Sequence, residues 1–323
     1  MKKRTFGRVG WPMSEVGYGM WGLAGWTGSD DAETMRSLDR AVDLGCTFYD
    51  TALAYGDGHS ERLLGRVVRA HSERRLYVAS KIPPLNQKWP SRPEYALDQV
   101  FPPDHIRRCT ETSLRNLGLE TMDLIQFHVW EDGWAEDPRW QREIEDLKRR
   151  GLVRAVGLSL HRWEPENGIR SLRTGLIDAV QVIYNIFDQA PEDALFPVCR
   201  ELGVAVIARV PFDEGTLTGT LTADSRWPEG DWRNTYFEPG NLKASVERAE
   251  ALRAVIPSEM TMPEMALRFI LSNVDVSTVI PGMRRARHVE ANLAASDKGG
   301  LDTGLIEILR LHRWDRKPAP WSD

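Results

Sequence analysis

The amino-acid sequence predicts an α/β protein built as a single-domain (β/α)8 TIM barrel, and two observations support this prediction. Short strand-like runs alternate with helical periodicity along most of the 323 residues. This alternation indicates parallel strands joined by right-handed crossovers. We count eight such strand–helix units, and eight units in about 300 residues favour a closed barrel over an open sheet. No linker, repeat or low-complexity tract divides the chain, so residues 1–323 are assigned to one domain.

The predicted elements follow one another in a regular order. A first strand near residues 16–21 precedes a helix over 31–44, in which Leu38, Ala41 and Val42 share one face. The same alternation of strand and helix patterns continues to the end of the barrel. It predicts strands at 47–50, 76–81, 123–128, 153–158, 179–182, 204–208 and 277–280, and helices at 60–70, 104–117, 138–150, 164–174, 192–202, 263–272 and 285–295.

Two segments interrupt this order. Residues 1–15 contain two short β-like pieces around Gly10, which predict a hairpin capping the N-terminal end of the barrel. Residues 210–240, after the seventh strand, are rich in Gly, Pro, Asp and Trp. They are too long for an ordinary connection, so we expect a functional loop there.

Composition excludes several classes of protein. The chain has 42 Lys and Arg against 47 Asp and Glu, a net charge of −5, and this mild acidity weighs against nucleic-acid binding. No apolar run approaches the ~18 residues of a membrane span, and no apolar region follows the basic start. Cys46, Cys109 and Cys199 lie far apart and form neither a disulfide framework nor a metal motif. We therefore expect a cytoplasmic protein with reduced thiols.

The glycine-rich string over residues 17–22 matches the pattern G-x-G-x-x-G of dinucleotide-binding folds. In those folds the last glycine opens a helix whose N-terminus meets the pyrophosphate. Here the helical pattern starts only near Asp30. The string is therefore interpreted as a turn at the barrel mouth and not as a Rossmann fingerprint.

Candidate catalytic groups stand at or just after three successive strand ends. Asp50 and Tyr55 follow the second strand, Lys81 the third and His128 the fourth. Each alone has a structural explanation: Asp as a helix cap, Lys as a solvated residue, His as a core residue. Because parallel strands bring their C-terminal ends together, their coincidence favours one active site.

These residue types suit proton donation to a carbonyl oxygen. A tyrosine with a pKa of about 10 is a weak acid at neutral pH unless its phenolate is stabilised. A neighbouring lysine ammonium provides that stabilisation, and an aspartate orients the lysine and keeps it charged. A histidine polarises the same oxygen. No side chain supplies a hydride, so the set requires a nicotinamide or a flavin.

At these residues the sequence resembles the aldo-keto reductase superfamily, from about Phe6 to Asn292. The matching segments are Phe48–Ala52, Tyr55–Gly56, Ser60–Glu61, Leu64–Gly65, Ser80–Lys81, Asp123–Leu124, Phe127–His128, Ile280–Arg284 and Asn292. The resemblance implies that Asp50, Tyr55, Lys81 and His128 form the catalytic tetrad, with Tyr55 as the proton donor. It also implies NADP(H) bound in extended form across the barrel mouth.

The resemblance implies a cofactor site with three departures from the family. Ser159 and Gln181 correspond to residues that hold the nicotinamide carboxamide, but Leu160 stands where the family usually has Asn, and Arg209 replaces an aromatic residue that stacks on the nicotinamide. The segment from Gly282 corresponds to the 2′-phosphate and adenine site, where Ala291 replaces an acidic residue or Gln. NADPH is expected, with NADH as the alternative. The expected cofactor contacts are Met20, Trp21, Ser159, Gln181, Arg209, Pro211, Leu217, Gly282, Met283, Arg284, His288 and Asn292.

The substrate side is less specific. Trp21 and Trp130 are expected to contact the substrate, and loops holding Trp227, Trp232 and Phe237 to line or cover the mouth. We expect an NADPH-dependent enzyme that reduces an aldehyde or ketone, including a sugar, to an alcohol, with no nucleic-acid or membrane partner. The alternatives are an NAD(P)-dependent sugar dehydrogenase or epimerase acting oxidatively, and a cofactor-sensing regulatory subunit with little turnover. A (β/α)8 lyase or isomerase is disfavoured because no metal-ligand motif is present. The substrate, the physiological direction and the oligomeric state are not specified.

Overall fold

A computed structural model describes residues 1–23 and 28–316. Its central sheet has eight parallel strands, each paired with its neighbour in chain order. Parallel bridges between Val16 and Val279 and between Gly19 and Gly282 join the first strand to the last. The predicted (β/α)8 barrel is therefore confirmed. The strands are β3 (Tyr18–Gly19), β4 (Phe48–Asp50), β5 (Tyr77–Ile82), β6 (Met122–Phe127), β7 (Val153–Ser159), β8 (Ala179–Ile183), β9 (Ala205–Arg209) and β10 (Val276–Val279).

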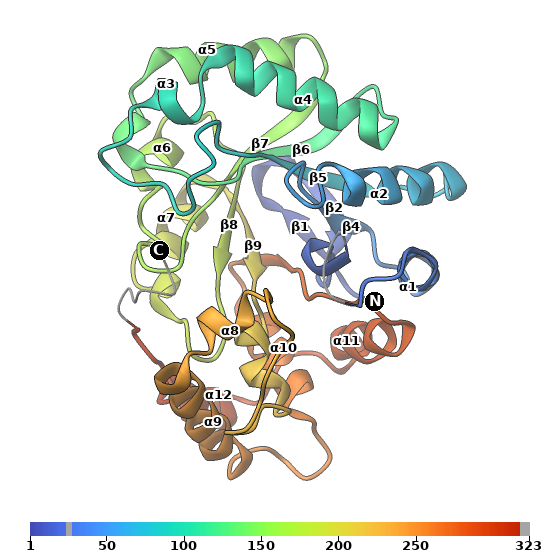
Figure 1. Ribbon diagram of the computed structural model, residues 1–323, viewed down its shortest axis with the longest axis vertical. Helices are drawn as coiled ribbons and strands as arrows, with labels where there is room; N and C mark the ends of the chain where they lie inside the picture. The colour runs from blue at the N-terminus through green and yellow to red at the C-terminus, as the bar shows by residue number, and fades with distance from the viewer. Residues whose placement is uncertain (24–27, 317–323) are drawn as a thin grey trace.

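Helices lie around the outside of these strands (Figure 1). The first of them buries an apolar face that includes Leu38, Ala41 and Val42, and Asp30 caps its N-terminus. The helices are α1 (Asp31–Asp43), α2 (His59–Ala70), α3 (Leu97–Val100), α4 (Pro103–Leu117), α5 (Pro138–Arg149), α6 (Ile169–Arg173), α7 (Leu195–Leu202), α8 (Arg233–Tyr236), α9 (Pro239–Arg253), α10 (Met262–Ser272), α11 (Ala286–Lys298) and α12 (Thr303–Arg310).

One predicted helix is shorter than its pattern. The helix expected over 164–174 begins only at Ile169. Pro165 disfavours helical geometry at the residue before it. Gly168 lies so close to the strand side that an added Cβ would be 2.9 Å from a methyl carbon of Leu160. After the end of β7 the chain therefore forms turns, and the helix starts only after these turns.

The predicted N-terminal hairpin is confirmed. Strands β1 (Lys3–Phe6) and β2 (Trp11–Ser14) pair antiparallel, with Phe6 opposite Trp11. The two rings stack with centroids 5.7 Å apart, and Phe6 also contacts Phe48 from the barrel. Phe6 and Met13 join a buried cluster with inward-facing strand residues such as Leu124. The hairpin thus covers one end of the barrel, and polar side chains gather at the other.

The long segment predicted after β9 is present, and it carries a small hydrophobic cluster of its own. It contains the 3-10 segment η5 (Asp213–Thr218) and α8. Trp227 stacks on Phe237 with ring centroids 5.1 Å apart, in a cluster with Leu242. Trp227 and Phe237 therefore stabilise the segment itself, whereas Trp232 of the same segment lies against Trp21 with ring centroids 5.2 Å apart.

Helix α2 packs closely on α4 at Gly65, and this contact predicts the effect of a substitution. A Cβ at Gly65 would lie 2.4 Å from the carbonyl oxygen of Leu117. Replacing Gly by Ala inside a helix normally stabilises it by about 1 kcal/mol. Gly65→Ala should instead lower the free energy of unfolding by about 1–3 kcal/mol, because a backbone carbonyl does not rotate away. Urea unfolding measures the change.

Gly133→Ala is the matched control, because a Cβ there meets no atom of the described residues within 4 Å. A Gly65→Ala protein as stable as Gly133→Ala would contradict the close contact between the two helices.

Candidate active site

The C-terminal end of the barrel holds a hydrogen-bonded group of three predicted residues. Lys81 Nζ, on β5, donates to Asp50 Oδ1 at 2.5 Å and lies 3.3 Å from the Tyr55 hydroxyl. It also donates to the carbonyl of Thr51 at 2.8 Å. The side chains of Lys81 and Asp50 are only 1% and 3% exposed. Strand β4 and the turn after it place Asp50 and Tyr55, so residues far apart in sequence meet as the strand ends predict.

Two glutamines hold the other oxygen of Asp50. The amide nitrogens of Gln126 and Gln181 donate to Asp50 Oδ2 at 3.0 and 2.9 Å. Gln126 was not predicted from the sequence. The alternation of inward-facing residues on β6 was a signal for it, because Leu124 faces the interior, and Gln126 and His128 follow at spacings of two.

The electrostatic environment suits a proton donor. Burial tends to lower the pKa of Lys81, but the Asp50 carboxylate and Tyr55 outweigh burial and raise this pKa, so the ammonium is charged. Burial raises the pKa of Tyr55, while the Lys81 ammonium acts in the opposite direction. The phenol therefore keeps its proton at neutral pH, beside a cation that stabilises the phenolate once the proton has left.

His128 follows β6 at the same end of the barrel and is neutral. Its ring lies edge-on to Tyr55, with centroids 5.6 Å apart. Burial, followed by the cations Lys81 and Arg209, lowers the pKa of His128 well below its ordinary value. Its Nδ1 is buried and has no hydrogen-bond partner among the residues described. A neutral imidazole beside the Tyr55 ring is suited to polarise a carbonyl oxygen.

Trp89 is a further side chain at the site that sequence reasoning did not identify. Its ring lies edge-on to His128, with centroids 4.6 Å apart, and the side chain is 40% exposed. It belongs to the irregular segment between β5 and α3, where no periodic pattern distinguishes it from a surface tryptophan. Its position forms a wall beside His128.

The neutral state of His128 predicts a pH dependence of stability. An unfolded histidine titrates near pH 6.5. Below that pH the unfolded state binds a proton that folded His128 does not bind. This group therefore reduces stability as the pH falls from 7 to 5, by up to about 1.4 kcal/mol per pH unit. In His128→Gln the free energy of unfolding should fall less steeply over this range, as measured by urea unfolding at each pH. Equal slopes in the two proteins would show that His128 titrates normally when folded.

The structure separates the predicted cofactor residues into two groups. Ser159 and Arg209 end β7 and β9 at the barrel mouth. In contrast, the side chains of Met20, Leu217 and Met283 are fully buried in the hydrophobic core. The carbonyl of Met283 accepts hydrogen bonds from the Tyr18 and Ser37 hydroxyls. In this structure these three side chains have no exposed surface for a cofactor, so we expect any contact at these positions to come from main-chain atoms.

The N-terminus of α11 fits an anionic group. Its N-cap residue, Arg285, makes no side-chain capping hydrogen bond. Burial and the neighbouring arginines, Arg287, Arg285 and Arg284, lower the pKa of His288. A Cβ added to Gly282 would meet no atom of the described chain within 4 Å. Free N–H groups, the helix dipole and clustered cations together suit a phosphate. Asn292 is buried further along the same helix.

The predicted substrate contact of Trp130 is wrong. The side chain is 2% exposed, and its indole nitrogen donates to Ser171 Oγ at 2.9 Å. Trp21 differs, because it is 43% exposed and lies against Trp232 with ring centroids 5.2 Å apart. The Trp130 ring does not face the mouth as expected but is enclosed by four aromatic rings, those of Phe101, Phe127, Trp134 and Trp140.

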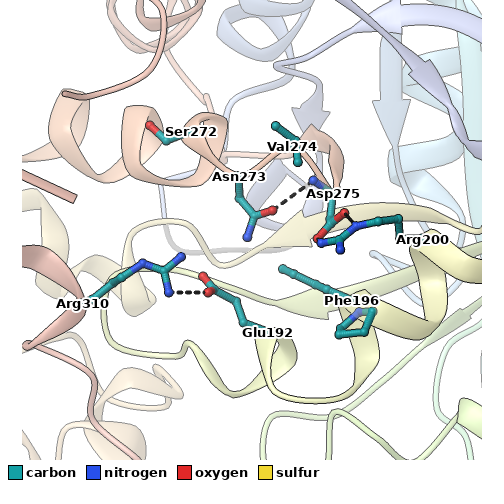
Figure 2. A pocket seen from close by; sticks show the side chains of 9 residues that line it. Glu192, Phe196, Arg200, Ser272, Asn273, Val274, Asp275 and Arg310 are labelled. Atoms are coloured by element: carbon teal, nitrogen blue, oxygen red, sulfur yellow. Dashed lines mark hydrogen bonds and ion pairs between the residues drawn. The ribbon is translucent and has the colours of Figure 1, made fainter. Parts of the chain in front are cut away.

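A separate hollow of about 280 Å³ lies between α7, α12 and the connection from α10 to β10 (Figure 2). Ion pairs join Arg310 to Glu192 at 2.7 Å and Arg200 to Asp275 at 2.5 Å. No residue of the Asp50–Tyr55–Lys81–His128 group lines this hollow. It is therefore distinct from the candidate active site.

The barrel and the Lys81-centred group at its open end define a class of (β/α)8 protein equipped for proton transfer. The sequence profile of the Aldo/keto reductase family matches residues 15–313, and the chain belongs to this family. The resemblance found in the sequence is thus confirmed. No helix among the described residues has the length and hydropathy needed to span a bilayer.

Several characterised proteins are similar over almost the whole chain. An NADH-specific methylglyoxal reductase of Escherichia coli K12 is 27% identical over 91% of this chain and 93% of its own length. The aldo-keto reductase yakc [NADP(+)] of Schizosaccharomyces pombe is also 27% identical, over 91% of this chain and 86% of its own length. The solved glycerol dehydrogenase AKR11B4 of Gluconobacter oxydans superposes with a TM-score of 0.75 at 26% identity, covering 96% of this chain and 95% of that one.

Proposed function

We propose that this protein reduces an aldehyde or ketone to an alcohol with NADPH, and that Tyr55 donates the proton. The observation that supports this most directly is the 3.3 Å contact between the Tyr55 hydroxyl and Lys81, with Lys81 paired to the buried Asp50. Membership of the Aldo/keto reductase family makes oxidoreductase chemistry the expected use of this group. The yeast relative is named for NADP(+) and the bacterial one for NADH, so NADH is the alternative cofactor.

When bound, a reduced nicotinamide supplies the hydride that the carbonyl carbon accepts. The residues of this chain supply the proton. Tyr55 donates it from its hydroxyl to the carbonyl oxygen, and the Lys81 ammonium stabilises the resulting phenolate. Asp50 keeps Lys81 oriented and charged. His128, being neutral, donates a second hydrogen bond from its ring N–H to the same oxygen.

The positions of the proposed cofactor residues assign them to the two ends of the cofactor. Gly282, Arg284, His288 and Asn292 would hold the adenosine phosphate end at the N-terminus of α11. At the nicotinamide end, Ser159 and Gln181 would hold the carboxamide. Gln181 would do so with its amide oxygen, because its Nε2 already donates to Asp50. Trp21 and Pro211 would complete the contacts, and Arg209 would lie beside the nicotinamide ring.

Mixing the purified protein with NADPH or NADH and a panel of aldehydes, ketones and keto-sugars tests the proposal. The loss of nicotinamide absorbance should be fastest with NADPH and at least one carbonyl compound. Faster reduction of NADP+ with sugars or alcohols would favour the oxidative dehydrogenase. Tight cofactor binding without turnover would favour a regulatory subunit, and no cofactor binding would reject the proposal.

A further inference from the structure

We propose that the guanidinium of Arg209 makes the site bind the reduced, uncharged nicotinamide more tightly than the oxidised, cationic form. This inference rests on the proposed function. Its consequence is a low affinity for the oxidised cofactor, so the product of each reduction leaves easily and inhibits weakly.

Arg209 is held at the open end of the barrel by its strand and by a hydrogen bond. It is the last residue of β9 and pairs in register with Ile183 of β8, so it stands at the open end of the barrel. Its Nη2 donates to the carbonyl of Leu160, just after β7, at 2.9 Å. Its Nε is buried and has no hydrogen-bond partner within residues 1–23 and 28–316. The guanidinium is therefore held in place, with a donor still unused inside the site.

Arg209 and Lys81 differ in whether a carboxylate pairs directly with the positive charge. Lys81 is paired with Asp50 at 2.5 Å. No carboxylate of the described chain lies within the ion-pair distance of 4.0 Å from Arg209. The acid acting most strongly on it is Glu214, whose recorded ion contact is with Arg162 at 3.9 Å. An arginine stays protonated in proteins, so among the described residues Arg209 brings to the mouth a positive charge that has no direct ion-pair partner.

The field of Arg209 reaches the reacting groups. It opposes the rise in the Tyr55 pKa that burial causes, and it adds to the burial and the Lys81 charge that lower the pKa of His128. For the reaction, the carbonyl oxygen lies at these two side chains, and the hydride donor must be within about 3–3.5 Å of the carbonyl carbon. A bound nicotinamide ring would therefore lie within the same field. Since only the oxidised ring is positively charged, Arg209 penalises the oxidised form alone.

The size of the effect follows from Coulomb's law. Two like charges about 6–10 Å apart, at the effective dielectric constant of about 20 that describes protein sites, correspond to roughly a 10- to 100-fold change in affinity. This change applies to the ratio of the dissociation constants of NADP+ and NADPH. The phosphates and the adenosine are the same in both forms and cancel in that ratio.

Direct binding measurements test the inference without turnover. The dissociation constants of NADPH and NADP+ would be measured by calorimetry for the wild type, Arg209→Gln and Arg209→Lys. Arg209→Gln removes the charge and keeps a planar donor. The dissociation constant of NADP+ divided by that of NADPH should therefore fall about 10- to 100-fold. Arg209→Lys keeps the charge and should retain a ratio close to that of the wild type. Arg285→Gln, at the N-terminus of α11, is the control: it should weaken both forms equally and leave the ratio unchanged.

The outcomes separate this inference from the proposed function. An unchanged ratio in Arg209→Gln, or a ratio in Arg209→Lys as low as in Arg209→Gln, would overturn the role of the charge and leave the reductase proposal standing. A wild-type protein that binds neither NADPH nor NADH would overturn both.

Discussion

Tyr55→Phe should lose about 10²- to 10⁴-fold of its carbonyl-reduction rate, the contribution typical of a positioned general acid. Affinity for NADPH should remain nearly unchanged, because the ring stays and only the hydroxyl bonded to Lys81 disappears. Steady-state kinetics and a separate NADPH titration measure the two effects.

Tyr77→Phe is the matched control for this substitution. Tyr77 begins β5, the strand that carries Lys81, and so lies at the opposite end of the barrel. Its variant should turn over at close to the wild-type rate. If Tyr55→Phe keeps a rate similar to that of Tyr77→Phe, another group protonates the substrate oxygen.

Asp213→Asn should lower the free energy of unfolding by about 3–5 kcal/mol, the cost of removing one partner from a buried ion pair. Asp213 is fully buried and accepts hydrogen bonds from Arg316 at 2.8 Å and Arg162 at 3.3 Å. Asp188 contacts the same two arginines. The network ties the loops after β7, β8 and β9 to the C-terminal segment. Asn preserves the shape of the side chain, so the loss of stability measures the contribution of the Asp213 charge.

Glu111→Gln provides the comparison for urea unfolding. Glu111 pairs with Arg150 at 3.3 Å on the surface, where both side chains are well exposed. Exposed pairs contribute about 0–1 kcal/mol. A loss in Asp213→Asn no larger than in Glu111→Gln would mean that the network does not stabilise the fold.

The four residues Asp50, Tyr55, Lys81 and His128 could be predicted together because parallel strands bring their C-terminal ends to one place. Individual side-chain environments could not be predicted in the same way. Trp130 follows β6 closely, as an active-site residue would, yet its ring is surrounded by aromatic residues from several outer elements. Local sequence does not show whether a side chain faces the active site or packs among the outer elements.

Contacts between distant parts of the chain were also outside the reach of sequence reasoning. Arg316 reaches Asp213 and Asp188 across the loops. Gln181 was assigned to the cofactor by resemblance, whereas its amide nitrogen donates to Asp50. Both cases depend on which polar groups remain unpaired after the barrel has closed, because buried donors and acceptors must find partners wherever the fold offers them.

The amino-acid sequence by itself determined the order of the eight barrel strands and of the helices that alternate with them, the hairpin at the N-terminus, the long segment after β9 and the family. These features follow from hydrophobic periodicity and local motifs, which act over short stretches of chain. Helices α3, α8, α9 and α12 were not predicted. Only the tertiary structure decided that Met20, Leu217 and Met283 turn into the core, that Trp89 borders His128, and that no carboxylate pairs directly with Arg209 among the residues described. Burial and charge compensation depend on neighbours brought together by folding, and those neighbours are set by packing around the closed barrel.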